Sequence, residues 1–290
     1  NKSINKDFGF NVAFNMSAIK NKMTELDGDV SYIGLPTSVI HSLNFDQEVS
    51  RSAIGQPIGS FYAYKEDGLF QSEAEIKSYT NNKGELLQPN AKPGDIKFVD
   101  VNGDGVIDGN DRDYIGNPLP DVTAGLTLGV NFHNFDLSLF FQGMFGNDVY
   151  DLTRYVGDFY NQSQYNKNSR VVNAWTPTNT NTDIPRVTMD DPNNNIRPSS
   201  YYVQDASFVR LKNMKIGYSV PQSILSKIKF NSLYIYAQAT NLFTITGYDG
   251  IDPEVGLQSY SSDYRNLDMG VDRGIYPLSR TFTFGVNVSF

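Results

Sequence analysis

Four stretches of the chain alternate apolar and polar residues with a period of two. They cover residues 8–16, 123–132, 135–142 and 281–290, and each alternation lasts about nine or ten residues. Successive side chains of a β-strand point to opposite faces, so a period of two predicts a strand. Each stretch is therefore expected to form a strand with one apolar face and one polar face.

Two further strands are expected at residues 233–240 and 206–219, although their alternation is less regular. In the second of them, the apolar positions change phase after Leu211. One extra residue in a strand shifts the alternation by one position, as in a β-bulge. We therefore predict a bulge near Lys212 or Asn213, and about six long strands in the whole chain.

The length and the polar composition of these strands narrow the fold class. Ordinary globular strands run about 5–6 residues, whereas a tilted strand that crosses a bilayer needs about 9–11. The polar positions hold mostly Gly, Ser, Thr, Asn and Gln. This composition suits an interior wall whose apolar face is turned to lipid, as in a transmembrane β-barrel. A large secreted β-sandwich also has alternating strands, so the periodicity alone leaves both architectures open.

The connections between the strands differ greatly in length. His133-Asn134 predicts a two-residue hairpin, because Asn can adopt a positive φ. Residues 220–231 form a short link in which Pro221 precedes apolar residues at helical spacing, so a helical turn is expected there. The long connections span residues 18–120, 147–205 and 242–277. If the strands run alternately up and down, every long loop lies at one end, as in outer-membrane barrels with long extracellular loops.

Composition changes this picture in three respects. The net charge of -8 argues against nucleic acid as a partner, because binding to phosphates requires clustered Lys and Arg. The chain has no Cys and two His, which excludes disulfides and disfavours His-based metal or catalytic sites, and it lacks the Walker A, GxSxG and HExxH motifs. We therefore expect no enzyme. The mean hydropathy of -0.39 averages apolar strand faces with long polar loops, so it does not argue against a membrane protein.

Residues 100–111 match the twelve-residue calcium loop. The expected ligands are Asp100, Asn102 and Asp104 at positions 1, 3 and 5, the Val106 carbonyl at position 7, Asp108 at position 9 and Asp111 at position 12. Gly105 occupies position 6, where the loop turns sharply, and position 12 is Asp instead of the usual Glu. The alternative is a turn-forming cluster of Asn, Asp and Gly. No helix pair is expected around the loop, so Ca2+ would be structural and would clamp a long loop.

Several motifs together resemble a known family. They are GSFYAYK at 59–65, GLF at 68–70, PGDIKF at 93–98, GNP at 116–118, FDLS at 135–138, FFQG at 140–143, WTP at 175–177, IPR at 184–186, DASFVRLKN at 205–213, TNLFT at 240–244, DPEV at 252–255, YP at 276–277 and RTF at 280–282. Together they resemble the C-terminal third of SusC/RagA-type transporters, which are TonB-dependent outer-membrane proteins of Bacteroidota.

The resemblance implies a 22-stranded barrel with an N-terminal plug. It also implies a SusD-like surface lipoprotein as a lid, energy from the TonB complex, and oligosaccharide or oligopeptide cargo. Residues 1–290 would then be the C-terminal segment of the barrel, since the plug and the N-terminal strands have no counterpart in this chain. The C-terminus, with its final aromatic Phe290, would be periplasmic, and the chain would need the remainder of its barrel and a lipid bilayer as partners.

Two other functions fit parts of the same pattern. A secreted, calcium-stabilised β-domain that binds carbohydrate would have to bury the apolar strand faces against a second sheet. A passive porin-like channel would lack the plug. The long loops are rich in Asn, Asp, Tyr, Pro and Gly, which suits either a surface covering or a ligand surface for sugars or peptides. No spacing in the loops identifies individual ligand contacts.

Overall fold

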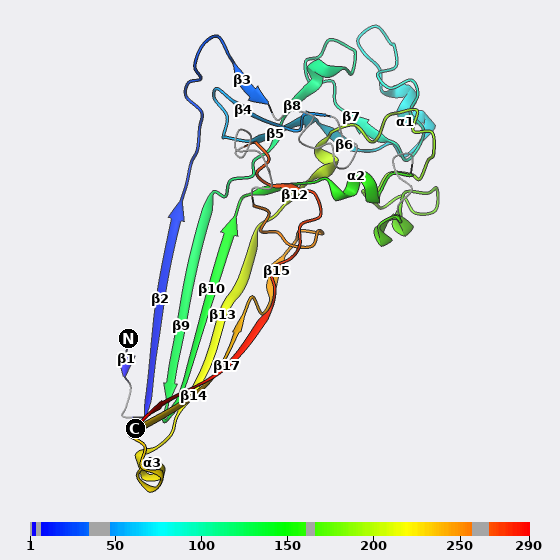
Figure 1. The fold of residues 1–290 in the computed structure, drawn as a ribbon. Coiled ribbons are helices and arrows are strands. Elements are labelled where there is room, and N and C mark those ends of the chain that lie inside the picture. Colours follow the sequence, from blue (N-terminus) through cyan, green and yellow to red (C-terminus); the bar gives the residue numbers. More distant parts are fainter. Residues whose placement is uncertain (1, 4–6, 35–46, 161–165, 257–266) are drawn as a thin grey trace.

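The computed structural model describes residues 2–3, 7–34, 47–160, 166–256 and 267–290. Long antiparallel strands form one sheet in the order β1-β2-β9-β10-β13-β14-β17, and β15 pairs with β13. The strands are β1 Lys2–Ser3, β2 Phe8–Ala18, β9 Val122–Phe132, β10 Phe135–Phe145, β13 Phe208–Ser219, β14 Ser232–Thr240, β15 Thr244–Thr246 and β17 Thr281–Ser289. Six of them are long and lie side by side (Figure 1). The expected all-β, antiparallel fold class with about six long strands is confirmed.

The register of the sheet separates apolar and polar side chains into complete rows. One row across the six strands contains Val12, Leu128, Leu139, Met214, Ala239 and Phe282. The adjacent row, on the other face, contains Asn11, Gly129, Ser138, Lys215, Gln238 and Thr283. On the apolar face, the residues Phe14 and Phe284 are 64% and 80% exposed. The face therefore presents a wide apolar surface that nothing in the described part of the chain covers.

The predicted bulge is present in β13. Phe140 of β10 pairs with Asn213, whereas the next residue, Phe141, pairs with Leu211. Lys212 is therefore the extra residue that is left without a partner in β10. Because of this extra residue, Leu211 and Met214 both lie on the apolar face, which explains the change of phase in the sequence.

The short connections lie at one end of the long strands. The hairpin between β9 and β10 has its positive φ, 53°, at His133, whereas the sequence suggested Asn134 for this role. The expected helical turn between β13 and β14 is α3, Gln222–Ile228, and it ends at Lys229, which has a φ of 59°. Figure 1 shows α3 beyond the ends of the strands, opposite the long loops.

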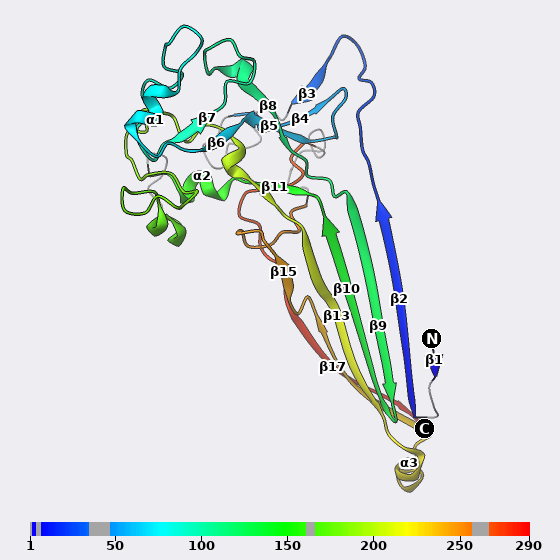
Figure 2. The ribbon, with the colours of Figure 1, turned by 180° about the vertical axis from the view of Figure 1, so that it is seen from behind.

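The long connections fold into a packed unit at the other end of the sheet (Figure 2). This unit contains the strands β3 Tyr32–Gly34, β4 Ser50–Ala53, β5 Ser60–Tyr64, β6 Glu66–Leu69, β7 Ile96–Phe98, β8 Arg112–Gly116, β11 Asp148–Asp151, β12 Val203–Asp205 and β16 Val271–Asp272. Its helices are α1 Glu73–Ser78, α2 Thr153–Gly157 and the 3-10 turns η2 Gly109–Asp111, η4 Ser169–Asn173 and η5 Ser200–Tyr202. Phe61, Phe98, Tyr150, Trp175 and Tyr202 belong to its buried core.

No helix among the described residues is both long and apolar enough to cross a membrane.

Candidate functional site

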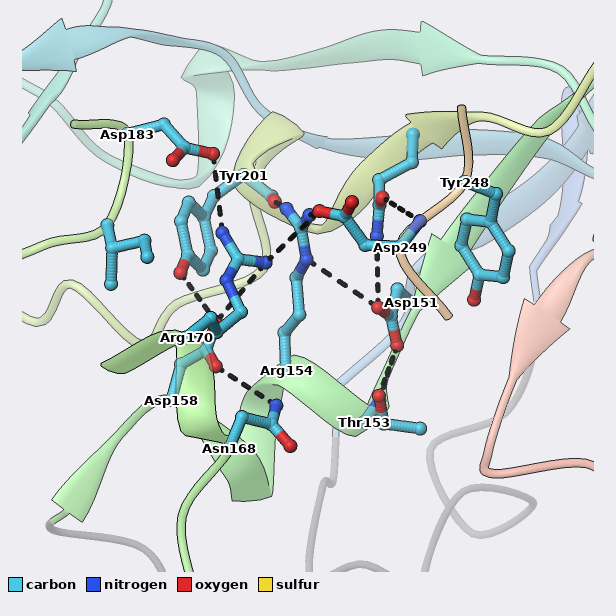
Figure 3. A network of polar contacts seen from close by, with 12 residues as sticks. Asp151, Thr153, Arg154, Asp158, Asn168, Arg170, Asp183, Tyr201, Tyr248 and Asp249 are labelled. Atoms are coloured by element: carbon cyan, nitrogen blue, oxygen red, sulfur yellow. Dashed lines mark hydrogen bonds and ion pairs between the residues drawn. The ribbon is translucent and has the colours of Figure 1, made fainter. Parts of the chain in front are cut away.

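A cavity of about 640 Å³ opens among the long loops. Ligand pockets commonly enclose about 300–1,000 Å³. Its walls come from four segments: the end of β11 with the start of α2, η4, residues 183–184 and residues 249–251. Figure 3 shows the polar side chains of these segments converging on one another.

Asp151, at the end of β11, forms one part of the floor of the cavity. β11 is held between β12 and β16, so the position of Asp151 is set by main-chain pairing on both sides. Its carboxylate accepts hydrogen bonds from the Thr153 hydroxyl at 2.6 Å and the Thr153 amide at 3.0 Å. Burial raises the pKa of Asp151 above its ordinary value, although the Thr153 hydrogen bonds and the Arg154 charge act in the opposite direction.

Asp158, just after α2, does not line the cavity but lies next to Arg170, which does. Its side chain is 1% exposed. It accepts hydrogen bonds from the Tyr201 hydroxyl at 2.6 Å and from the Asn168 side-chain amide at 3.1 Å. Burial, together with the negative charge of Asp158, raises the pKa of Tyr201 well above its ordinary value, so Tyr201 acts as a donor.

Two arginines lie next to these two carboxylates. Arg154 is 7% exposed; it donates to the Tyr201 carbonyl at 2.8 Å, and its Nε lies 3.5 Å from Asp151. Arg170, in η4, lies with one terminal nitrogen 3.8 Å from Asp158. Each guanidinium group therefore has a buried carboxylate beneath it, which fixes its position in the wall.

Asp183 and Asp249 lie at the mouth of the cavity. Asp249 accepts a hydrogen bond from Arg154 at 3.0 Å and lies 3.8 Å from Arg170, so it bridges the two arginines (Figure 3). Asp183 pairs with the other terminal nitrogen of Arg170 at 3.3 Å. In contrast to the two buried carboxylates, the side chains of Asp183 and Asp249 are 74% and 62% exposed.

Sequence reasoning did not find this site. Its residues are spread over about a hundred positions, from 151 to 251, and their order along the chain has no fixed spacing. The only signal was the Asn-, Asp- and Tyr-rich composition of the loops, which is also typical of a loop that merely covers a surface. Burial and partner identity, which distinguish Asp158 from Asp249, follow from tertiary packing alone.

The predicted calcium loop lies between β7 and β8, in the same loop unit. Asp100 accepts from the Gly103 and Gly105 amides at 2.8 and 2.9 Å, Asn102 accepts from the Asp104 amide at 2.8 Å, and Asp104 accepts from the Val106 amide at 2.9 Å. Gly105 has a φ of 87°, as a sharp turn at position 6 requires. The first half of the motif thus folds into one tight turn, which these side-chain to backbone hydrogen bonds hold together.

The second half of the motif closes the loop through Asp111. This residue is fully buried, and its carboxylate accepts from the Val101 amide at 2.8 Å and from the Asp108 amide at 2.7 Å. Asp108 caps η2 and accepts from the Asn110 amide. Among the described residues, no three His, Asp or Glu side chains are grouped as metal ligands. The oxygen donors of the motif have the chemistry that Ca2+ requires, while their hydrogen bonds go to the loop's own backbone.

The chain is similar in sequence to several TonB-dependent receptors. No family model matches it. It is 38% identical over 287 residues to TonB-dependent receptor P3 of Formosa agariphila, covering 99% of this chain and 27% of that receptor. TonB-dependent receptor P26 of the same organism is 33% identical over 98% of this chain. TonB-dependent receptor SusC of Bacteroides thetaiotaomicron is 27% identical over 99% of this chain. The chain spans about a quarter of the length of these curated relatives.

Solved structures show the same fold. The RagAB peptide importer in its open-open state matches with a TM-score of 0.71 at 23% identity, covering 99% of this chain and 27% of that chain. The RagAB peptide transporter matches with a TM-score of 0.71 at 24% identity, covering all of this chain. These relatives and neighbours are named as receptors, importers and transporters and none is named as an enzyme, in agreement with the expectation from the sequence.

Proposed function

Because the chain resembles SusC/RagA-type TonB-dependent transporters over nearly its whole length, we propose that it forms part of the wall of an outer-membrane nutrient importer. The observation that carries this proposal is the separation of the sheet into one apolar and one polar face. A sheet that crosses a bilayer presents apolar side chains to lipid and polar side chains to the lumen. The apolar row through Leu128 and Leu139 and the polar row through Gly129 and Ser138 have this arrangement.

In this proposal, residues 1–290 are the C-terminal section of a larger barrel. Along its whole length β2 pairs with β9, whereas β1 covers only Gly9 and Phe10 on its other side. Within the described residues, β17 pairs with β14 alone. In lipid, each unpaired backbone group costs several kcal/mol, about the cost of burying a polar group without a partner. Further strands of the same barrel would therefore complete both edges, and a plug would fill the lumen.

The resemblance also supports the remaining parts of the proposal. The loop unit would lie outside the cell, with α3 and the C-terminus on the periplasmic side. A SusD-like lipoprotein would cover the loops, the TonB complex would supply energy through the rest of the protein, and the cargo would be oligosaccharide or oligopeptide.

Membrane fractionation of cells that produce the full-length protein tests this function. We expect the protein to stay in the outer-membrane pellet after extraction with high salt and with alkaline carbonate, and to be released by detergent. A secreted, calcium-stabilised β-domain buries its apolar faces internally and is released without detergent. Release by carbonate would therefore contradict the proposal.

We propose in addition that the loop at residues 100–111 binds a structural Ca2+. Asp100, Asn102, Asp104, the Val106 carbonyl, Asp108 and Asp111 would be the ligands or would hold the ligands in place. The bound ion would neutralise carboxylates that the loop crowds together, and would fix the link between β7 and β8. Ile107 packs against the main core of the loop unit, so this link is joined to the rest of the unit.

Removing Ca2+ is expected to expose this link to proteases. Trypsin can cut after Lys97 and Arg112, and we expect chelation of the full-length protein to increase cleavage at these two sites several-fold, because loops without a bound ion open more often. Asp100→Asn with Asp104→Asn should raise cleavage even in calcium, while Asp113→Asn, outside the motif, should not. Cleavage that is unchanged by chelation would contradict calcium binding.

A further inference from the structure

The charges around the cavity are not balanced. The side chains that line it include the carboxylates of Asp151, Asp183 and Asp249 and the guanidinium groups of Arg154 and Arg170. The lining therefore carries one surplus negative charge, and its two exposed carboxylates, Asp183 and Asp249, lie at the mouth. Lys167 does not line the cavity, and its ammonium group donates to the carbonyls of Val156 and Phe159.

The carboxylates of Asp183 and Asp249 are held in place, but their capacity to accept hydrogen bonds is not saturated. Both contact the same guanidinium group, that of Arg170, and in each carboxylate the contact uses the oxygen Oδ2. Within the described part of the chain, no hydrogen bond reaches Oδ1 of Asp183 or Oδ1 of Asp249. An ionised carboxylate can accept about four hydrogen bonds. Each of these two groups therefore has acceptor capacity left, and Arg154 and Arg170 fix where that capacity points.

Two guanidinium nitrogens behind these carboxylates lack a hydrogen-bond acceptor. Arg154 Nε and Arg170 Nη1 are buried and have no hydrogen-bond acceptor among the described residues. The nearest carboxylates lie 3.5 Å from Arg154 Nε and 3.8 Å from Arg170 Nη1. Both nitrogens are buried, so the groups that a ligand at the mouth can reach are the carboxylates of Asp183 and Asp249, and a positive group would match them.

Charge decides between the classes of ligand. An anionic ligand would approach two exposed carboxylates on a chain of net charge -8 and would have to displace Asp249 from both arginines. A neutral ligand would leave the surplus charge uncompensated. A cationic group is attracted at long range and then finds two carboxylate oxygens that are already positioned, at little cost in ordering.

From these observations we infer that the cavity binds the ammonium group of an incoming cargo, with Asp183 and Asp249 as its counter-ions. The group would belong to an amino sugar or to the N-terminus or a lysine of a peptide, because these are the ammonium groups that the two proposed classes of cargo can carry. This inference deepens the proposed function and rests on it only in taking the loop end as the side from which cargo arrives.

Binding of paired probes to the purified full-length protein tests this inference. One pair is a glucosamine tetramer and its N-acetylated form; the other is a short Gly/Ala peptide with a free or an acetylated N-terminus. In both pairs acetylation removes the charge. We expect the cationic member of at least one pair to bind about tenfold more tightly, with the preference falling as salt is added. The pair that shows the preference identifies the source of the amine.

Substitution of the two carboxylates locates the preference. Asp183→Asn together with Asp249→Asn should abolish it, whereas Asp190→Asn, an exposed aspartate in the same loop, should retain it. If the double variant does not fold, Asp183→Asn alone decides, because the ion pair that Asp183 forms among the described residues is an exposed one with Arg170, and loss of the charge should weaken the preference several-fold. Equal binding of charged and acetylated probes would overturn the inference, as would tighter binding of a succinylated probe. A protein that stays in the membrane pellet but shows no such preference would overturn this inference and leave the proposed function standing.

Discussion

Replacing Leu128 by arginine is expected to prevent stable assembly of the barrel. Leu128 lies in the middle of β9 and belongs to the apolar row, between Val12 of β2 and Leu139 of β10. An arginine on the lipid-facing side near the bilayer midplane costs roughly 2–4 kcal/mol. We expect Leu128→Arg in the full-length protein to lower the free energy of unfolding in vesicles by this amount, and to reduce the folded fraction on unheated gels.

Thr127 provides a matched control, because it precedes Leu128 in the same strand and lies on the polar face. Thr127→Arg introduces the same charge at the same depth, and the lumen side can hydrate or pair it. We expect this variant to cost less than half as much as Leu128→Arg. Equal effects of the two substitutions would show that the two faces have similar surroundings, and would contradict the proposed orientation of the sheet.

Removing the Arg210 side chain is expected to loosen residues 244–254, which comprise β15 and the loop that follows it, from β13. Arg210 is 2% exposed and lies near the loop end of β13. It donates to Asp252 at 2.5 Å, to Glu254 at 3.0 Å and to the Thr244 hydroxyl at 2.8 Å. Breaking a buried ion pair by removing one partner costs about 3–5 kcal/mol, because the other charge stays buried. We expect Arg210→Ala to lower stability by this amount and to increase amide exchange in residues 244–254.

Lys212 and pH provide controls for this expectation. Lys212 also contacts Glu254, at 2.7 Å, but it is more exposed than Arg210, so Lys212→Ala should cost less than about 1 kcal/mol.

Burial raises the pKa of Asp252, but hydrogen bonds from the Glu254 amide, Arg210 and the Leu278 amide outweigh it, and the pKa is lowered overall. Because the pKa of Asp252 is lowered in the folded protein, its ionised carboxylate contributes to the free energy of unfolding at neutral pH. This contribution is lost as the pH falls below about 4. Arg210→Ala should lose part of this acid sensitivity; an unchanged acid transition would contradict the role of the pair.

The strands could be predicted from the sequence because the two faces of the sheet place apolar and polar side chains at alternate positions. Six long strands, the bulge at Lys212 and the helical turn at α3 all follow from local periodicity or local turn chemistry, and all are present. The positive φ of the hairpin is at His133 and not at Asn134. This detail could not be predicted, because the sequence pattern does not specify which of the two turn residues has the positive φ.

The loop unit could not be predicted in the same way. Strands such as β11 and β16 are only two to four residues long, which is too short for a periodic signal. Their parallel pairing joins Tyr150 to Val271, more than a hundred residues apart. The cavity depends on contacts that are similarly distant in sequence, since Arg154 contacts both Asp151 and Asp249. The calcium motif is the exception, because its chemistry is contained in twelve consecutive residues, and calcium binding there stays a prediction.

The claim that one face of this sheet contacts lipid is tested most directly by spin labels along β9. The chain contains no cysteine, so single cysteines can be introduced at positions 124 to 131 of the full-length protein without background labelling from this segment. In vesicles, contact with oxygen, which concentrates in the bilayer, should be high at positions 124, 126, 128 and 130 and low at positions 125, 127, 129 and 131. Oxygen contact that is uniformly low at all eight positions would mean that the apolar face is buried against protein, and would contradict the account.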